Sequence, residues 1–269
     1  MVSESVAKKL ERVGRVAYVN ALAPLAPALG APVRFYLLAT ARSGSSLLRS
    51  MLDSHPDIRC DPEMLAKWGR LVPPARLYAA RSVHARFRYK AHAYGSKAIA
   101  DQVAAIPPDH GATFLARMNQ RGYRIITVTR RDTLARAISR LEARRSRVWQ
   151  HREGDHRHSG PILVRMEEIE AELNFAEHSL EFVEASVKEL PHLRVVYEDD
   201  LDTPDAQQAT FDRLCNELGL RRAKATTDIV RSGARSMRDR IANYDEMMEF
   251  VRGSRFAAYA DPARRHSQP

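Results

Sequence analysis

YLLATARSGSSLLRSMLDSHP, residues 36–56, joins an apolar run to a helical pattern through a short polar loop. Residues 35–40 (FYLLAT) are mostly apolar and end in polar residues, as in a strand that is buried on both faces. After the loop, apolar residues recur at helical spacing and predict a helix over Ser45–Asp53. This stretch therefore predicts a strand, a loop and a helix in direct succession.

The loop between the predicted strand and helix has the features of an oxyanion site. Ser43, Gly44, Ser45 and Ser46 run into the start of the helix, where backbone N–H groups lack partners and the helix dipole is positive. Arg42 adds a permanent charge, and Gly44 lets the backbone approach a bulky anion. A Walker A loop would need G-x-x-x-x-G-K-[ST], but this loop has one glycine and no lysine. An ordinary serine and glycine helix cap is the alternative interpretation.

The rest of the chain alternates strands with helices. A second clear strand is predicted at 123–129 (YRIITVT), which is rich in β-branched residues, and a third at 193–197 (LRVVY). A short strand is also expected at 87–92 (FRYKAH). Helices are expected over 96–105, 132–149, 166–189 and 205–218. This alternation predicts an α/β fold, a central parallel sheet flanked by helices, whose ligands lie at the carboxyl ends of the strands.

A second basic motif follows the strand predicted at 123–129. Arg131 stands at the exit of this strand, and Ser139 lies eight residues later, about two turns into the next helix. A guanidinium and a hydroxyl in this arrangement suit an anion, although a solvated basic helix also explains them. Two anion sites at neighbouring strand ends together predict a ligand with two anionic ends.

The composition narrows the classes of function. The chain has 269 residues with 44% hydrophobic content, enough for one sizeable core, and its formal net charge of +10 favours anionic partners. Nucleic acid is not expected, because aromatic residues make up only 7% of the chain and no nucleic-acid motif is present. Cys60 and Cys215 have no metal or redox spacing, so we expect a cytoplasmic protein.

Residues 1–32 are expected to form an N-terminal helix and linker that pack on a domain of residues 33–269. A basic stretch precedes the uncharged residues 16–33, as in a secretory signal, but Glu4, Glu11 and three prolines argue against one. The sequence contains no purely apolar run long enough to span a membrane.

These motifs, in this order, resemble those of sulfotransferases that use 3′-phosphoadenosine 5′-phosphosulfate (PAPS). ARSGSSLLRSMLDSHPDIRC is similar to the family's P-[RK]-[ST]-G-[ST]-[ST] loop, with Ala41 in place of the usual proline. It looks most like the loop of tyrosylprotein sulfotransferases and of bacterial trehalose and nodulation-factor-type carbohydrate sulfotransferases. Arg131 and Ser139 match the R-x7-S motif, and VVYEDDLDTPDAQQATFDRLCNELGL resembles a third family element. The resemblance covers about residues 34–260 and implies a P-loop-NTPase-like sulfotransferase fold.

The resemblance also implies an activity: transfer of a sulfuryl group from PAPS to a hydroxyl of a carbohydrate, glycolipid or other small-molecule acceptor, with no metal required. It implies that the loop binds the phosphosulfate, with Arg42 and Ser46 at the leaving group. Arg131 and Ser139 would bind the 3′-phosphate, and Tyr197 would line the nucleotide pocket. A P-loop kinase-like phosphotransferase or a PAPS-binding pseudoenzyme is the alternative function.

Two residues are candidates for the catalytic base. Laying RCDPEML on the tyrosylprotein pattern puts Glu63 at the base position. YKAH instead offers His92, in the order of the histidine of cytosolic sulfotransferases. Either side chain could take the proton of an alcohol, and Glu63 is the preferred candidate.

Other segments raise narrower expectations. His151, His156 and His158 lie among arginines and predict a solvated loop rather than a metal site. By resemblance, the basic segment 231–240 closes over the nucleotide. The helix over 132–149 is expected to attract an anionic glycolipid or saccharide through its arginines, which are Arg136, Arg140, Arg144, Arg145 and Arg147. A homodimer and a peripheral membrane contact both remain open.

Overall fold

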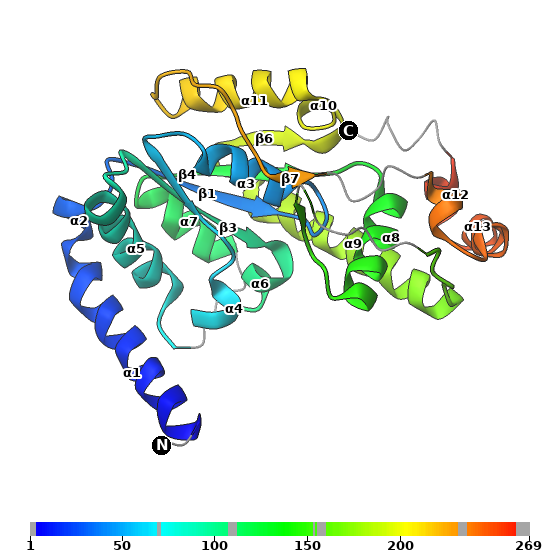
Figure 1. Ribbon diagram of the computed structural model, residues 1–269, viewed down its shortest axis with the longest axis horizontal. Coiled ribbons are helices and arrows are strands. Elements are labelled where there is room, and N and C mark those ends of the chain that lie inside the picture. The colour runs from blue at the N-terminus through cyan, green and yellow to red at the C-terminus, as the bar shows by residue number, and fades with distance from the viewer. Residues whose placement is uncertain are drawn as a thin grey trace.

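A parallel β-sheet lies at the centre of the computed structural model, which describes residues 4–68, 71–106, 112–152, 154, 160–230 and 236–261 (Figure 1). In the described residues it has five strands in the order β2-β3-β1-β4-β6, and each neighbouring pair is parallel. The strands are β1 (Val33–Ala39), β2 (Ile58–Asp61), β3 (Ala93–Ile99), β4 (Tyr123–Thr129) and β6 (His192–Val196). The predicted α/β fold with a central parallel sheet is confirmed.

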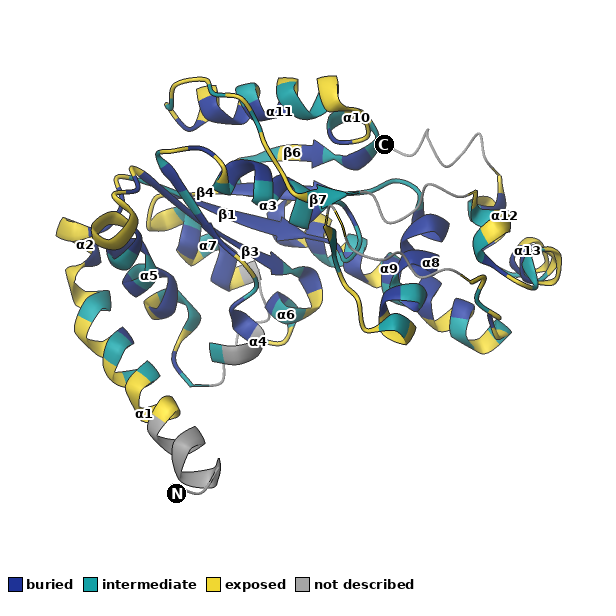
Figure 2. Ribbon diagram, in the orientation of Figure 1, coloured by how far each residue is buried: buried dark blue, intermediate teal, exposed yellow. Residues whose placement is uncertain are grey.

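Helices cover both faces of the sheet. On one face, α1 (Glu4–Leu22), α5 (Pro74–Tyr89) and α7 (Ala112–Gln120) pack on Tyr36 and Leu38 of β1. On the other face, α3 (Ser45–Asp53) and α11 (Pro204–Glu217) pack on Phe35 and Leu37. Because successive side chains of a strand point to opposite faces, most of β1 is buried on both sides, as its apolar run predicts (Figure 2).

A third apolar cluster joins α8 (Thr133–Ser146), α9 (Met166–Val187) and α13 (Tyr244–Gly253) to the right of the sheet in Figure 1. Short helices connect the larger elements: α2 (Ala26–Leu29), α4 (Leu65–Trp68), α6 (Ala100–Ala104), α10 (Tyr197–Asp200) and α12 (Met237–Arg240), with 3-10 turns at Ala23–Leu25 and Ala257–Ala260. A small antiparallel ribbon pairs β5 (His151–Arg152) with β7 (Ile229–Val230).

The strand expected over 87–92 is wrong. Residues 87–89 form the exposed last turn of α5, which ends at Tyr89, and Lys90 follows as its C-cap with a left-handed φ of 54°. Strand β3 follows and takes the first residues of the helix expected over 96–105. Its Gly95, Ser96 and Lys97 conceal the strand pattern. Gly95 is required there because a Cβ would lie 2.0 Å from the ring of Phe35.

The expected N-terminal helix is present as α1, which packs against α5. Val19 of α1 is fully buried in the core cluster that contains Tyr36 and Tyr78. The ring of Tyr18 also meets that of Trp68 edge to face, with 6.0 Å between the centroids. In the part of the chain that the structure describes, every helix is too short or too polar to cross a membrane.

Candidate functional site

The loop between β1 and α3 contains two left-handed backbone conformations. Arg42 has a φ of 62° and Gly44 a φ of 80°, and Gly44 occupies the N-cap position of α3. A Cβ on Gly44 would lie 2.6 Å from Cδ2 of Tyr197, so the ring of Tyr197 fills the space that a side chain would take. Glycine is therefore needed here for the turn and for the approach of Tyr197.

The serines of the loop differ in what they contact. Ser43 is fully buried, and its hydroxyl donates to the carbonyl oxygen of Thr40 at 2.8 Å. This hydroxyl is therefore engaged within the loop rather than offered to a ligand. Ser45 and Ser46, in the first turn of α3, both line a cavity beside the loop.

Arg42 connects the loop to α8. Its Nε donates to Oγ of Ser139 at 2.9 Å, and its Nη1 donates to the carbonyl oxygen of Trp149. Burial and the neighbouring charge of Arg130 lower the pKa of Arg42, which means that both disfavour its charged form. A nearby anion would stabilise that charged form. The family resemblance assigns Arg42 to the phosphosulfate and Ser139 to the 3′-phosphate. In the structure these two side chains are hydrogen-bonded to each other.

The cavity beside the loop has a volume of about 970 Å³, a size typical of small-molecule and cofactor sites. Predicted site residues that line it are Arg42, Gly44, Ser45, Ser46, Glu63, Ser139 and Tyr197. Further lining residues include Lys97, Asp101, Gln102, Arg130, Arg140, Trp149, Gln150, Phe175 and Arg240. The cavity therefore combines several cationic side chains with a few carboxylates, amides and aromatic rings.

Lys97 supplies the lysine that the loop lacks. It stands opposite Leu37 of β1 and is only 2% exposed, and its Nζ donates to Oγ of Ser46 at 2.9 Å. The same ammonium group lies 2.8 Å from Oε1 of Glu63. Lys97 was not predicted as a site residue, because the sequence pattern placed residues 96–105 in a helix instead of a strand. The available signal was a single charge within the run AYGSKAIA.

Glu63 is held at the cavity by contacts on both of its oxygens. Its Oε2 accepts a hydrogen bond from Nε2 of Gln102 at 2.6 Å, while its Oε1 contacts Lys97.

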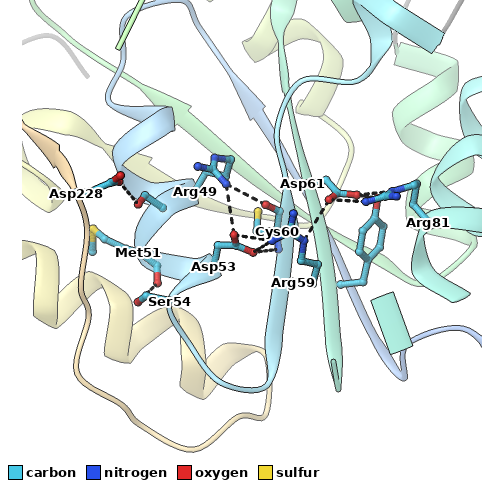
Figure 3. Close-up of polar contacts among 11 residues, drawn as sticks. Arg49, Met51, Asp53, Ser54, Arg59, Cys60, Asp61, Arg81 and Asp228 are labelled. Atoms are coloured by element: carbon cyan, nitrogen blue, oxygen red, sulfur yellow. Dashed lines mark hydrogen bonds and ion pairs between the residues drawn. The ribbon is translucent and has the colours of Figure 1, made fainter. Parts of the chain in front are cut away.

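Strand β2 ends two residues before Glu63 at Asp61, which is 1% exposed and accepts hydrogen bonds from Arg81 and Tyr94. Figure 3 shows the series of ion pairs that runs from Arg49 through Asp53, Arg59 and Asp61 to Arg81. This network fixes the end of β2 and thus the start of the segment that carries Glu63.

The structure places Arg131 and Arg130 differently. Arg131 forms an ion pair with Asp199 and is not among the described residues that line the cavity. Arg130 does line it, with its guanidinium carbon 4.6 Å from the centre of the Tyr197 ring. The carboxylate of Glu198 accepts the backbone N–H groups at the start of α8. This geometry favours Arg130 over Arg131 as the guanidinium that meets a ligand.

His92 lies at the amino ends of the strands, whereas the loop lies at their carboxyl ends. It precedes β3, whereas the loop follows β1, and these strands pair in register from Val33 with Ala93 to Ala39 with Ile99. The 7 residues of β3 span roughly 20 Å. His92 is therefore too far from the cavity to act as a base there, and Glu63 is the candidate that the fold brings to it.

The other histidines and the C-terminal basic segment are described in part. His151 begins β5 and lines the cavity, while His156 and His158 lie outside the described residues. Residues 231–235 lie outside them as well, and Arg240 of the same segment lines the cavity. Within the described ranges, no group of three or more His, Cys, Asp and Glu side chains is arranged to hold a metal ion.

The arginines of α8 do not form a free basic face. Arg140 and Arg144 both form ion pairs with the buried carboxylate of Glu172 on α9, and Arg145 pairs with Glu168. These carboxylates offset the charge that the sequence alone assigns to the helix. That this face attracts an anionic glycolipid or saccharide stays a prediction.

Comparison with known proteins gives only a distant likeness. No protein-family model matches the chain, and no curated protein matches it. Among solved structures, it is similar to polyphosphate kinase 2 from Arthrobacter aurescens TC1, with 16% identity, 85% of each chain covered and a TM-score of 0.38. A likeness at this level carries no argument about activity. The succession of β1, a tight loop and α3 at the end of a parallel sheet nevertheless makes the fold P-loop-like on its own geometry.

Proposed function

We propose that the protein transfers a sulfuryl group from PAPS to a hydroxyl of a carbohydrate, glycolipid or other small acceptor. The observation that carries this proposal is the arrangement of Arg42, Ser46, Lys97 and Glu63 around one cavity. It places cationic and hydroxyl donors, which suit an anionic donor substrate, beside a carboxylate that can take a proton. The identity of the transferred group rests on the resemblance of the loop and R-x7-S motifs to those of sulfotransferases.

The anion-binding side of the cavity suits the two ends of such a donor. The start of α3, Arg42 and Lys97 offer positive charge for a phosphosulfate. We assign the 3′-phosphate to Arg130 and Ser139, with the ring of Tyr197 beside them. This assignment keeps the serine of the R-x7-S motif and replaces its arginine by the preceding residue.

Hydrogen bonding orients the hydroxyl of Ser46. Its oxygen accepts from Nζ of Lys97 at 2.9 Å and from Nε2 of Gln150 at 3.0 Å, which occupies both lone pairs of a hydroxyl. The hydroxyl hydrogen is thereby left to donate. We assign this hydrogen bond to the bridging oxygen of the phosphosulfate.

In the proposed reaction, the acceptor oxygen attacks the sulfur in line with the bridging oxygen. A sulfur–oxygen bond forms to the acceptor and the bond to the bridging oxygen breaks, so its electron pair leaves with 3′-phosphoadenosine 5′-phosphate. The proton of the acceptor passes to Glu63. Lys97, Arg42 and Ser46 stabilise the negative charge that grows on the leaving group.

Phosphoryl transfer from a nucleoside triphosphate is the second candidate function. One observation favours it: Lys97 and Ser46 together put a lysine and a hydroxyl at the start of α3, the pair that a Walker A loop takes from one segment. A pseudoenzyme that binds PAPS without transferring sulfate is a third outcome, which binding alone would not separate from an enzyme.

Calorimetric titration with 3′-phosphoadenosine 5′-phosphate, hereafter the bisphosphate, tests the donor assignment. We expect micromolar binding to the wild type and a loss of about tenfold or more in Arg42→Ala. Binding of ATP with magnesium in place of the bisphosphate would overturn the proposal in favour of phosphoryl transfer. Labelled PAPS and a panel of saccharides and lipid-linked saccharides then test transfer, and binding without transfer to any of them would indicate a pseudoenzyme.

A further inference from the structure

Arg136 on α8 is one of the largest fully buried side chains of the described residues, at 2% exposure, and no carboxylate in those ranges forms an ion pair with it. Its Nη1 makes no hydrogen bond there. Its remaining contacts are long: Nε reaches the carbonyl oxygen of Ala41 at 3.4 Å, and Nη2 that of Ala176 at 3.3 Å. A buried guanidinium with such poor compensation costs folding free energy, so the fold alone does not explain why it is there.

The contact with Ala41 places the guanidinium of Arg136 against the loop between β1 and α3, hereafter the anion loop. The carbonyl group of Ala41 belongs to the peptide that leads into Arg42, the first left-handed residue of the loop. Burial first, and then repulsion from Arg130, lower the pKa of Arg136 to about 10, which leaves it a cation at neutral pH. Glu198 opposes this shift, but its carboxylate oxygens accept backbone N–H groups at the start of α8.

We propose that Arg136 is part of the anion site: it lies against the loop at Ala41 and supplies a buried positive charge whose counter-ion is the 5′ anionic group of the ligand. The identity of that group rests on the proposed function, whereas the electrostatic argument holds for any anion on the loop. Because Nε of Arg136 contacts the carbonyl oxygen of Ala41 at the start of the loop, its charge would act on an anion bound there, and charges interact strongly where water is excluded. The free protein therefore carries an uncompensated charge that ligand binding compensates.

Arg136→Met separates this role from a purely structural one, because it should change stability and affinity in opposite directions. Methionine removes the buried charge, so we expect the free variant to unfold at the wild-type temperature or above it. Affinity for the bisphosphate should fall about tenfold or more. Affinity for adenosine 3′-monophosphate, which lacks the 5′ group, should stay within about twofold.

Arg124→Met is the matched control, since it removes an exposed charge at the amino end of β4, away from the loop. It should leave both affinities within about twofold of the wild type. If the methionine variant unfolds, Arg136→Gln gives the same test, because glutamine keeps a donor for the carbonyl oxygens but no charge. Wild-type affinity for the bisphosphate in a folded variant, or an equal loss for both nucleotides, would overturn the proposal.

Inorganic pyrophosphate separates this inference from the proposed function. One outcome is that the wild type binds pyrophosphate but not the bisphosphate, and that Arg136→Met binds pyrophosphate more weakly than the wild type does. The PAPS assignment then fails and the role of Arg136 stands. If the wild type binds the bisphosphate and Arg136→Met binds it equally well, the inference about Arg136 fails alone. Binding of none of the three probes by the wild type overturns both.

Discussion

Among single residues, Lys97 lies between the two parts of the proposed reaction, anion binding and proton removal. Because its ammonium contacts both Ser46 and Glu63, Lys97→Met removes a charge beside the leaving group and frees both partners to move. We expect the turnover number with labelled PAPS to fall about 100-fold or more, while affinity for the bisphosphate falls less than about tenfold. Lys188→Met, at an exposed position after α9, is the control and should change neither quantity. A loss of affinity with an unchanged turnover number would show that Lys97 acts only in binding.

Arg130 and Arg131 are adjacent in sequence but differ in what their side chains meet. Arg130 lines the cavity beside Tyr197, whereas Arg131 pairs with the exposed carboxylate of Asp199. We therefore expect Arg130→Ala to weaken binding of the bisphosphate by about tenfold or more, and Arg131→Ala by less than about threefold. Parallel calorimetric titrations of the two variants measure this ranking. The reverse ranking would restore the motif's own assignment of Arg131.

Among the elements, those with a regular pattern could be predicted from the sequence, and those shaped by tertiary contacts could not. β1 and β4 are apolar runs, and α3 has leucines at helical spacing, so local patterning was sufficient. β3 contains Gly95, which lies against the ring of Phe35, and Lys97, which donates to Ser46 of α3. Neither residue can be recognised as part of a strand until these partners are known. The succession of β1, the loop and α3 was predicted because its residues are contiguous, whereas the pairing of Lys97 with Glu63 joins segments that are distant in sequence.

We expect the ion pair between Asp61 and Arg81 to help hold the end of strand β2, beside its pairing with β3. The carboxylate of Asp61 is buried, so Arg81→Met leaves a buried charge without its main partner and should cost about 3–5 kcal/mol of unfolding free energy. The double variant Asp61→Asn, Arg81→Met should recover part of this loss, because it removes the stranded charge. Denaturant unfolding of the single and double variants measures both effects.

An exposed ion pair provides the comparison for this experiment. Arg152 and Asp228 pair at 3.1 Å with side chains that are more than half exposed, so Arg152→Met should cost less than about 1 kcal/mol. A loss in Arg81→Met as small as this would mean that the network in Figure 3 does not determine the position of β2. The placement of Glu63 would then need another explanation.

For the whole molecule, the question is whether α1 belongs to the folding unit that carries the cavity. A boundary between residues 32 and 33 predicts an appended segment, yet Val19 is fully buried beside Tyr36 of the central strand. If α1 is part of the same unit, Val19→Ala should lower the free energy of the single global unfolding transition by on the order of 1–3 kcal/mol. Its affinity for the bisphosphate should not change, because α1 and the loop helix α3 contribute to different core clusters.

Val13→Ala, on the same helix at 59% exposure, is the control and should leave the transition within about 0.5 kcal/mol of the wild type. Scanning calorimetry distinguishes the alternatives, because it resolves separate transitions. If Val19→Ala shifts a minor early transition and leaves the main one in place, residues 1–32 fold as a separate segment on a domain that is stable without them. If the main transition shifts instead, the N-terminal helix is a structural part of the domain whose sheet carries the anion loop at its carboxyl edge.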